Sequence, residues 1–266
     1  MKLRSITTVL ATILTLLTYS GEANAQFNFG RLLQGLTKGV QAVTLNDSQV
    51  VGYVKEYIHY SDSVNQVLPA GEEYSLRLAR ITKGITSVDG TPLNFKVYKN
   101  EEVNAFACAD GSVRVYTGLM DIMTDEEVLG VIGHEIGHVA HHDSRQAFKQ
   151  AMMNEAIMDG LASTRSTIAN LTDSQLGQIG NALMSSKFSR KQEQNADDYG
   201  YSFLKANGRN PAAMVYAFRK LQSMEKASGS QSSALSQLFS SHPDVGSRIE
   251  RMTKKARKDG FTVNPQ

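Results

Sequence analysis

The sequence of 266 residues has a single cysteine, Cys108. An internal disulfide is therefore excluded, and the fold must be stabilised by a hydrophobic core. Because Cys108 lies in an apolar, strand-like stretch, we interpret it as a small buried hydrophobic residue rather than as a reactive or metal-binding thiol.

An excess of charge of one sign is also lacking. The chain has 28 basic and 26 acidic residues, which gives a formal net charge of +2. The one basic cluster, residues 254–258, is interpreted as the solvated face of a terminal helix. The composition therefore predicts no nucleic-acid partner.

Long apolar runs are missing after the first 25 residues, so we predict no membrane span there. Those first residues have a positive start at Lys2 and Arg4, an apolar stretch from Ile6 to Leu17, and an A-x-A sequence that ends at Ala25. This pattern predicts a signal peptide cleaved after Ala25. We expect a periplasmic protein, with an uncleaved signal anchor and peripheral attachment to a membrane as alternatives. No cysteine stands near the cleavage site, which excludes lipid attachment at that site.

The rest of the sequence is long enough for one large globular domain, or for a core domain with a helical appendage, and we predict a mainly helical α+β fold. We expect a flexible arm at 26–45, a single domain at 46–258 and a tail at 259–266. Residues 159–188 are rich in Ser, Thr, Gly and Asn and are interpreted as a helical insertion or lid.

The most informative segment is His134-Glu135-Ile136-Gly137-His138. On a helix, histidines four residues apart lie on one face and can chelate one zinc ion. Glu135 points about 100° away from His134 around the helix axis. It can therefore act as a base on the solvent side of the metal without binding the metal itself.

Local signals favour a buried helix here. Thr124 and Glu127 form a capping box, and a stripe of apolar residues at helical spacing follows: Val128, Ile132, Ile136 and Val139. We expect the helix to continue through His142. Gly130, Gly133 and Gly137 share one face, which predicts that another element, expected to be a sheet, packs very close to it.

Other segments predict helices and strands around this helix. We expect a helix at 72–85 with Leu76 and Leu78 on its apolar side, and a two-residue hairpin turn at Asp110-Gly111. Strands are expected at 93–98, 103–109 and 113–117, and further helices at 48–60, 189–206, 210–226 and 244–258.

Two histidines do not complete a catalytic zinc site, which normally has three protein ligands and a water. The H-E-x-x-H-x-x-G-x-x-H extension is rejected, because His141 and Ser144 stand at its Gly and final His positions. The other zincin class takes a glutamate from a later helix, and Glu193 fits, with Asp197 placed to orient a zinc-bound histidine. Spacing alone leaves Glu193 open between a zinc ligand and a solvated helix residue.

The two motifs together resemble the family of HtpX and the CAAX prenyl endopeptidases, and the likeness to a periplasmic member of that family runs from about residue 45 to 258. Three further segments match: the edge strand Asn104-Ala105-Phe106-Ala107, residues 115–119 before the zinc helix, and Ser241-His242-Pro243 with Arg248 after it. HtpX and the prenyl endopeptidases are embedded in membranes, whereas this sequence has no span after its signal. A prenylated substrate is therefore not expected.

The resemblance implies a gluzincin fold with a small sheet, an active-site helix and a helical remainder. It implies one zinc ion (Zn2+) held by His134, His138 and Glu193. It also places His242 near the zinc, either stabilising an oxyanion or filling the open coordination position in a resting form; the alternative is a capping or surface histidine. Arg248 is expected to bind substrate or to stabilise developing charge.

The predicted activity is that of a zinc metalloendopeptidase of the cell envelope that hydrolyses unfolded or misassembled proteins. Glu135 is the predicted base, and Asn104 to Ala107 is the predicted strand on which substrate pairs. The expected partners are unfolded or misfolded proteins and the outer-membrane assembly machinery. The alternative function is a chaperone-like assembly factor whose protease activity is latent.

Overall fold

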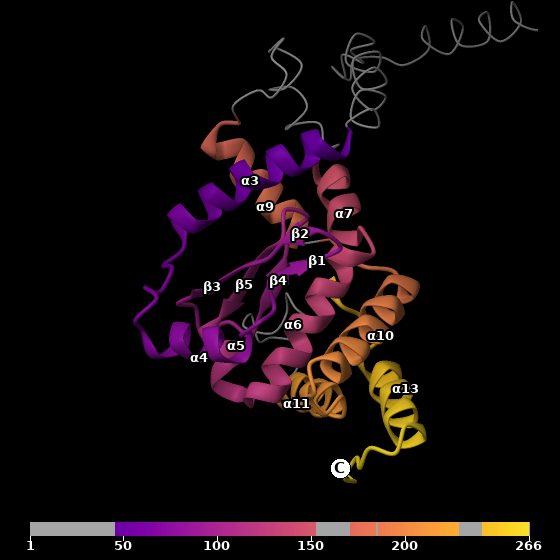
Figure 1. Ribbon diagram of the computed structural model, residues 1–266. Helices are drawn as coiled ribbons and strands as arrows, with labels where there is room; N and C mark the ends of the chain where they lie inside the picture. Colours follow the sequence, from indigo (N-terminus) through magenta and orange to yellow (C-terminus); the bar gives the residue numbers. More distant parts are fainter. Residues whose placement is uncertain (1–45, 153–170, 185, 229–240, 266) are drawn as a thin grey trace, which may run out of the picture. The chain divides into compact units, whose positions relative to one another are not determined.

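The computed structural model describes residues 46–152, 171–184, 186–228 and 241–265 (Figure 1). The predicted signal peptide at 1–25 and the predicted arm at 26–45 lie outside these residues. So do 159–170 and 185 of the predicted lid. Within the described part of the chain, no helix is both long and apolar enough to cross a bilayer.

Two small sheets form the β part of the fold. Strand β3 (Asn94–Tyr98) pairs in parallel with β5 (Ser112–Tyr116), and β4 (Ala105–Ala107) pairs with β5 in antiparallel. The strand order is therefore β3-β5-β4, with β4 at an edge. Strands β1 (Ser87–Val88) and β2 (Thr91–Pro92) form a separate antiparallel pair. The three predicted strands are all present.

The two-residue hairpin turn lies between β1 and β2, not between β4 and β5. Asp89 and Gly90 have φ values of 45° and 78°, as both central residues of a type I′ turn require. In the predicted turn only Gly111 has a positive φ, of 86°. There the Gly111 N–H donates to the Cys108 carbonyl at 2.9 Å, so the loop is longer than two residues.

The histidine-bearing helix is α6 (Asp125–Ala140), and its capping box is formed as predicted. The Thr124 N–H donates to Glu127 Oε2 at 2.7 Å, and the Glu127 N–H donates to Thr124 Oγ1 at 3.4 Å. The predicted apolar stripe is buried in the main core, together with Val97, Val113 and Val115 of the sheet. In Figure 1, α6 lies between the sheet and the helices α10 (Arg190–Ala206) and α11 (Ala213–Ser228).

The element packed against the glycine face of α6 is helix α10, and the expectation of a sheet is wrong. A Cβ on Gly137 would lie 2.9 Å from Ala196 Cα, and one on Gly133 would lie 3.2 Å from Gly200 Cα. In return, a Cβ on Gly200 would lie 2.9 Å from the His134 backbone nitrogen. Glycines on both helices thus allow a backbone-to-backbone crossing, and this crossing brings the E-x-x-A-D segment to the histidines.

Helix α4 (Glu73–Ile81) is shorter than predicted and ends before Gly84, whose φ is 85°. Leu78 is 2% exposed, whereas Leu76 is 56% exposed. The prediction for Leu76 was wrong because residues two apart do not share a helix face.

Three helices pack against one another (Figure 1): α3 (Asp47–Val64), α7 (Asp143–Met152) and α9 (Asp173–Met184), with α3 drawn above the sheet. Helix α9 lies in the described part of the predicted lid, residues 171–184 and 186–188. Helix α3 is also joined to the sheet by an ion pair. Nε and Nη2 of Arg114 in β5 donate to the carboxylate of Asp62 in α3 at 2.7 and 3.0 Å. Arg114 is 1% exposed, so this ion pair is buried on the arginine side.

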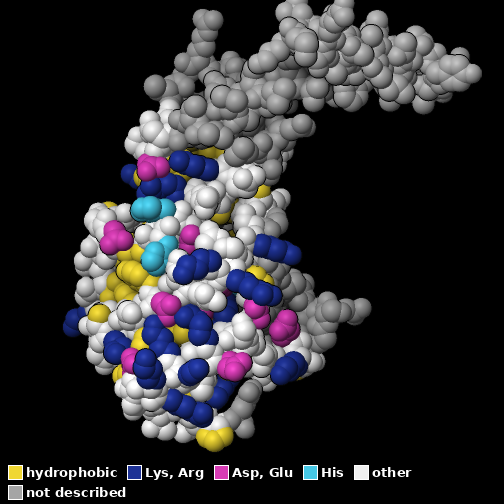
Figure 2. All heavy atoms as spheres, turned by 90° about the vertical axis from the view of Figure 1, so that its right-hand side faces the viewer, with side chains coloured by type: hydrophobic (Ala, Val, Ile, Leu, Met, Phe, Trp, Pro, Cys, Tyr) yellow, Lys and Arg dark blue, Asp and Glu magenta, His cyan; other side chains and the backbone are white. Residues whose placement is uncertain are grey.

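Helix α13 (Val245–Lys258) carries the predicted basic cluster. Lys254, Arg257 and Lys258 are exposed, and Lys255 pairs with Asp198 at 2.5 Å. Figure 2 shows basic side chains intermixed with acidic ones over this side of the molecule. The predicted tail is anchored to the domain, because the Asn264 N–H donates to Tyr216 Oη at 3.1 Å and Val263 is 4% exposed.

Candidate metal centre

Helix α6 ends sooner than predicted, and the break supplies a partner for His138. The helix ends at Ala140, and His142 has a φ of 63° that no helix interior accepts. The chain restarts as α7 at Asp143, whose carboxylate Oδ2 lies 3.0 Å from His138 Nδ1. Gln192 Nε2 donates to the other oxygen of Asp143 at 3.0 Å. His141 and His142 are exposed.

His134 has an equivalent partner on α10. Its Nδ1 lies 3.0 Å from Asp197 Oδ1, and Asp197 is fully buried. When Nδ1 of each histidine donates to a carboxylate, each Nε2 presents a lone pair. The two Nε2 atoms lie 3.2 Å apart. Two nitrogen lone pairs at this distance repel each other unless a cation or an added proton lies between them.

Glu193 faces the two histidines from the first turn of α10. Ser189 caps this helix in a capping box with Gln192, which fixes the backbone at Glu193. Glu193 Oε1 lies 3.4 Å from His138 Nε2, and Oε2 lies 3.7 Å from His134 Nε2. The glutamate is 2% exposed, so it is not the solvated helix residue that spacing alone left possible.

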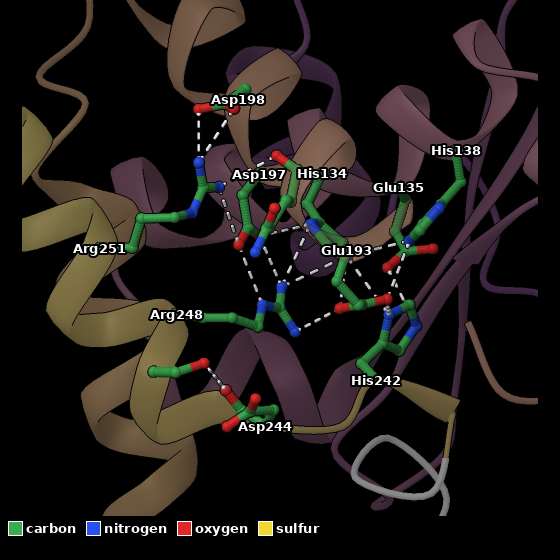
Figure 3. A network of polar contacts seen from close by, with 12 residues as sticks. His134, Glu135, His138, Glu193, Asp197, Asp198, His242, Asp244, Arg248 and Arg251 are labelled. Carbon is green, nitrogen blue, oxygen red and sulfur yellow. Dashed lines mark hydrogen bonds and ion pairs between the residues drawn. The ribbon is translucent and has the colours of Figure 1, made fainter. Parts of the chain in front are cut away.

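Arg248 of α13 compensates the two buried carboxylates of α10. Its Nη1 lies 2.5 Å from Glu193 Oε2, and its Nη2 lies 2.7 Å from Asp197 Oδ1. The guanidinium carbon lies 4.4 Å from the ring centroid of Phe218. Figure 3 shows Glu193 between Arg248 and His242. The Arg248 side chain is 5% exposed, and its nitrogens face carboxylates rather than open solvent.

These contacts determine the charge states of the site. Burial would raise the pKa of Asp197, but the charge of Arg248 and the hydrogen bond from His134 outweigh it and hold that pKa below its usual value. Burial likewise opposes ionisation of Glu193, and the neighbouring histidines outweigh it, so its pKa is also lowered. Both carboxylates are therefore ionised at neutral pH. Burial and the charge of Arg248 lower the pKa of His134, which favours its neutral, metal-binding form.

His242 completes a group of four donors. Its Nδ1 lies 3.3 Å from His134 Nε2 and 3.0 Å from Glu193 Oε1. One donor atom from each of His134, His138, Glu193 and His242 falls within 4.8 Å of the others. His242 is 7% exposed, so it is not the surface residue of the alternative interpretation.

Phe188, immediately before the cap of α10, was not predicted as part of the site. Its ring stacks on His138 with centroids 3.9 Å apart and planes 13° apart. Its N–H donates to the Ser241 carbonyl at 3.1 Å, which joins the start of α10 to the segment that carries His242.

Glu135 lies next to the donor group but outside it. It comes from the same helix as the two histidines, is 4% exposed, and its Oε1 lies 3.7 Å from His242 Nε2. It lines a pocket together with the edge strand residues Asn104 to Ala107. The predicted base and the predicted substrate strand therefore share one pocket.

The donor set fits zinc. Ligand atoms about 2.0 to 2.2 Å from a tetrahedral zinc are separated from one another by roughly 3.3 to 3.6 Å. Here the separations are 3.2 Å between the two Nε2 atoms and 3.4 Å from His138 Nε2 to Glu193 Oε1. Two imidazoles and one carboxylate, each imidazole held by a second carboxylate, form the ligand set of a catalytic zinc rather than of a structural one.

A site of this kind, on a mainly helical α+β fold, defines a zincin-type metallopeptidase. Residues 76–256 match peptidase family M48, and the chain belongs to that family. The protein is a zinc metalloendopeptidase, and the predicted fold class and zinc cofactor are confirmed.

Three relatives illustrate the family. The chain is 38% identical to Metalloprotease LoiP of Escherichia coli (strain K12) over 264 residues, which are 98% of this chain and 100% of LoiP. It is 37% identical to Metalloprotease YcaL of the same strain over 213 residues, 80% of this chain and 82% of YcaL. Identity to the Beta-barrel assembly-enhancing protease of Escherichia coli O157:H7 is 28% over 178 residues, which are 63% of this chain and 35% of that protein.

Two residues of the site escaped the sequence prediction. Asp143 had a signal, a carboxylate five positions after His138, but its role depends on the helix ending before it. Phe188 had none, because stacking on a distant histidine leaves no periodic pattern.

Proposed function

We propose that His134, His138 and Glu193 hold the zinc ion and that Glu135 is the general base of peptide hydrolysis. The observation that carries this proposal is the 3.2 Å approach of the two Nε2 atoms, each histidine being held from behind by Asp197 or Asp143. Glu135 lies beside these donors without joining them.

When bound, zinc supplies a Lewis acid that polarises the scissile carbonyl and makes water more acidic. Glu135 accepts the proton of the attacking water and delivers it to the leaving amine. Arg248 keeps Glu193 and Asp197 ionised and oriented, so it acts as a positioning residue. The contact of His242 with Glu193 supports a resting form in which His242 occupies the position that substrate must take.

The substrate pairs with β4 in this proposal. The Tyr116 N–H of β5 donates to the Asn104 carbonyl at 3.1 Å, and the Cys108 N–H donates to the Ser112 carbonyl of β5 at 2.9 Å. In an antiparallel pair the alternate residues point their main-chain groups the other way, so those of Ala105 and Ala107 face the outer edge of β4. The Ala105 N–H there donates to Asn104 Oδ1 at 2.9 Å, so a bound segment pairs with the Ala105 carbonyl and with Ala107. A segment bound through these groups is recognised by its backbone, which favours extended, unfolded substrates.

We further propose that the protein is exported and removes unfolded or misassembled proteins in the cell envelope. The N-terminal sequence supports export. The similarity to a β-barrel assembly-enhancing protease supports a link with outer-membrane assembly. Fractionation of cells should recover a mature form that begins at Gln26 in the periplasmic fraction or peripherally bound to a membrane. Recovery of the uncleaved chain in the cytoplasm would contradict this part.

The test of the catalytic role is Glu135→Gln. This variant should bind one zinc ion per chain and fail to degrade casein, because an amide cannot accept the proton. Glu126→Gln is the matched control on the same helix, since Glu126 pairs with Arg209 at 2.9 Å, away from the site. Casein degradation by Glu135→Gln at the parent rate would show that Glu135 is not the base.

The second candidate function is a chaperone-like assembly factor whose protease activity is latent. The observation that favours it is the position of His242 among the zinc donors, where it would fill the open coordination position. This function predicts that Glu135→Gln still supports outer-membrane protein assembly in cells that lack the parent protein. The protease function predicts that it does not.

A further inference from the structure

Gln192 binds two different groups with the two ends of its side-chain amide. Its oxygen Oε1 accepts from the Ser189 N–H at 2.9 Å and from Ser189 Oγ at 2.8 Å, which closes the capping box of α10. Its nitrogen Nε2 donates to Asp143 Oδ1 at 3.0 Å. The amide therefore joins the beginning of α10 to the beginning of α7, which lies 49 residues earlier in the chain.

The capping box does not need the second of these contacts. The box uses only an acceptor oxygen at this position of the helix, and glutamate supplies that oxygen as well as glutamine does. The helix dipole would also favour glutamate within the first turn. What glutamine adds is an N–H donor, and here that donor binds the Asp143 carboxylate.

The Asp143 carboxylate is buried between two donors. It is 7% exposed; Oδ1 accepts from Gln192, and Oδ2 lies 3.0 Å from His138 Nδ1. The terminal torsion of an aspartate has broad energy minima, so its own rotamer preference does not fix the plane of the carboxylate. The hydrogen bond from Gln192 fixes that plane from outside the donor group and leaves the other oxygen for His138.

The two carboxylates that hold the histidines are supported by different chemistry. Asp197 is held by the charged guanidinium of Arg248, at 2.7 Å. Asp143 is held by a neutral amide, and among the described residues no lysine or arginine forms an ion pair with it. A neutral donor orients a carboxylate without cancelling its charge, so Asp143 retains its full charge for the hydrogen bond to His138.

We infer that Gln192 is a positioning residue of the metal centre: its amide nitrogen fixes the Asp143 carboxylate, which in turn fixes the ring of His138. The inference rests on the proposed function, because it concerns zinc only if His138 is a ligand. It goes beyond that function by making the cap of α10 a part of the metal centre. One side chain then sets both the helix that carries Glu193 and the turn that orients His138.

Gln192→Met keeps the length of the side chain and removes its donor. It should bind zinc about 3- to 10-fold more weakly than the parent in competition with a chelator of known affinity. Gln194→Met is the matched control, because Gln194 is an exposed residue of the same helix, and it should bind zinc as the parent does. Urea unfolding of the zinc-free proteins measures the cost of the lost capping oxygen separately. An unchanged zinc affinity of Gln192→Met would overturn the inference.

A swapped pair separates orientation from capping. In Asp143→Asn, the new amide faces two donors, Gln192 Nε2 and His138 Nδ1, and its single oxygen cannot serve both. In Asp143→Asn/Gln192→Glu, a glutamate oxygen accepts from the asparagine NH2 group, which leaves the asparagine oxygen for His138. The capping oxygen and the net charge of the parent are both retained.

The swapped pair should bind zinc at least about threefold more tightly than Asp143→Asn/Gln194→Glu, which has the same net charge but keeps the conflict between donors. Equal zinc affinities of these two double variants would show that Gln192 acts only as a cap, and would overturn the inference.

His138→Gln separates this inference from the proposed function, because it removes the ligand itself and should lose tight zinc binding. If it does so while the Gln192 variants bind zinc like their controls, only the inference about Gln192 fails. If His138→Gln binds zinc with the affinity of the parent, the proposed ligand set is wrong, and the inference fails with it.

Discussion

Substitution of Gly137 by alanine tests whether the crossing of α6 and α10 builds the zinc site. The new Cβ would lie 2.9 Å from Ala196 Cα and 3.0 Å from the Ala196 carbonyl oxygen. Both are backbone atoms, so α10 must move as a body, and Glu193 and Asp197 move with it. The residue Gly130 offers a matched control on the same helix, because its nearest neighbour is the flexible side-chain atom Met214 Cγ at 3.2 Å.

The expected magnitudes have opposite signs for the two variants. Alanine gains about 1 kcal/mol of helix propensity over glycine at either position. At Gly137 the overpacking costs about 1 to 3 kcal/mol, so the free energy of unfolding should be unchanged or fall by up to about 2 kcal/mol. Displacing the carboxylates should weaken zinc binding by about 10- to 100-fold, the usual effect of disturbing the groups that orient metal ligands. Gly130→Ala should unfold at the same or a higher urea concentration and should bind zinc as the parent does.

The assays are urea unfolding of the zinc-free proteins and competition for zinc with a chelator of known affinity. Zinc binding by Gly137→Ala with the affinity of the parent would refute the reasoning, whatever its stability. So would an equal loss of zinc affinity in Gly130→Ala, because the loss would then not depend on the approach of α10.

Three further predictions follow from other contacts. Asp143→Asn should weaken zinc binding about 10-fold or more, because the amide no longer holds the tautomer of His138; an unchanged zinc affinity would contradict the contact. The Arg114 and Lys96 hydrogen bonds outweigh burial and lower the pKa of Asp62 to about 2. Above pH 4 the ionised carboxylate of Asp62 therefore contributes about 1 to 2 kcal/mol to the free energy of unfolding, allowing for solvent screening, and this contribution should be lost between about pH 4 and 2. The urea midpoints of the parent and of Asp62→Asn should converge as the pH falls over this range. A constant difference between the two midpoints would refute the prediction. Burial raises the pKa of the Cys108 thiol, so a thiol reagent should modify it only after unfolding. Rapid modification of the native protein would contradict this and show that the loop between β4 and β5 opens.

Much of the metal centre could be predicted because its sequence signals are either local motifs or residues spaced with the period of a helix. The capping box at Thr124 fixes where α6 begins, and the helical repeat then places His134 and His138 on one face. The glycines of α6 gave a further signal, a close neighbour, but not its identity. The spacing of the glycines indicates that another element approaches this face closely, but it does not indicate whether that element is a strand or a helix.

The parts that escaped prediction depend on long-range packing or on single backbone angles. The sequence gives no indication that Arg248 faces Glu193 and Asp197, because that contact depends on how α13 crosses α10. The early end of α6 depends on the positive φ of His142, an angle that histidine adopts more readily than most residues but that its presence in the sequence does not require. The Asp-Gly pairs at Asp89 and Asp110 show the same limit, since of these two only Asp89-Gly90 lies in a two-residue turn. The neighbouring strands decide this, and the dipeptide does not.

The most direct test of the central claim is a crystal structure of the zinc-loaded protein with anomalous data collected at the zinc edge. The account predicts one strong peak per chain within bonding distance of His134 Nε2, His138 Nε2 and a carboxylate oxygen of Glu193. A peak that lies elsewhere, or that is bonded to the two histidines while Glu193 remains paired only with Arg248, would contradict it.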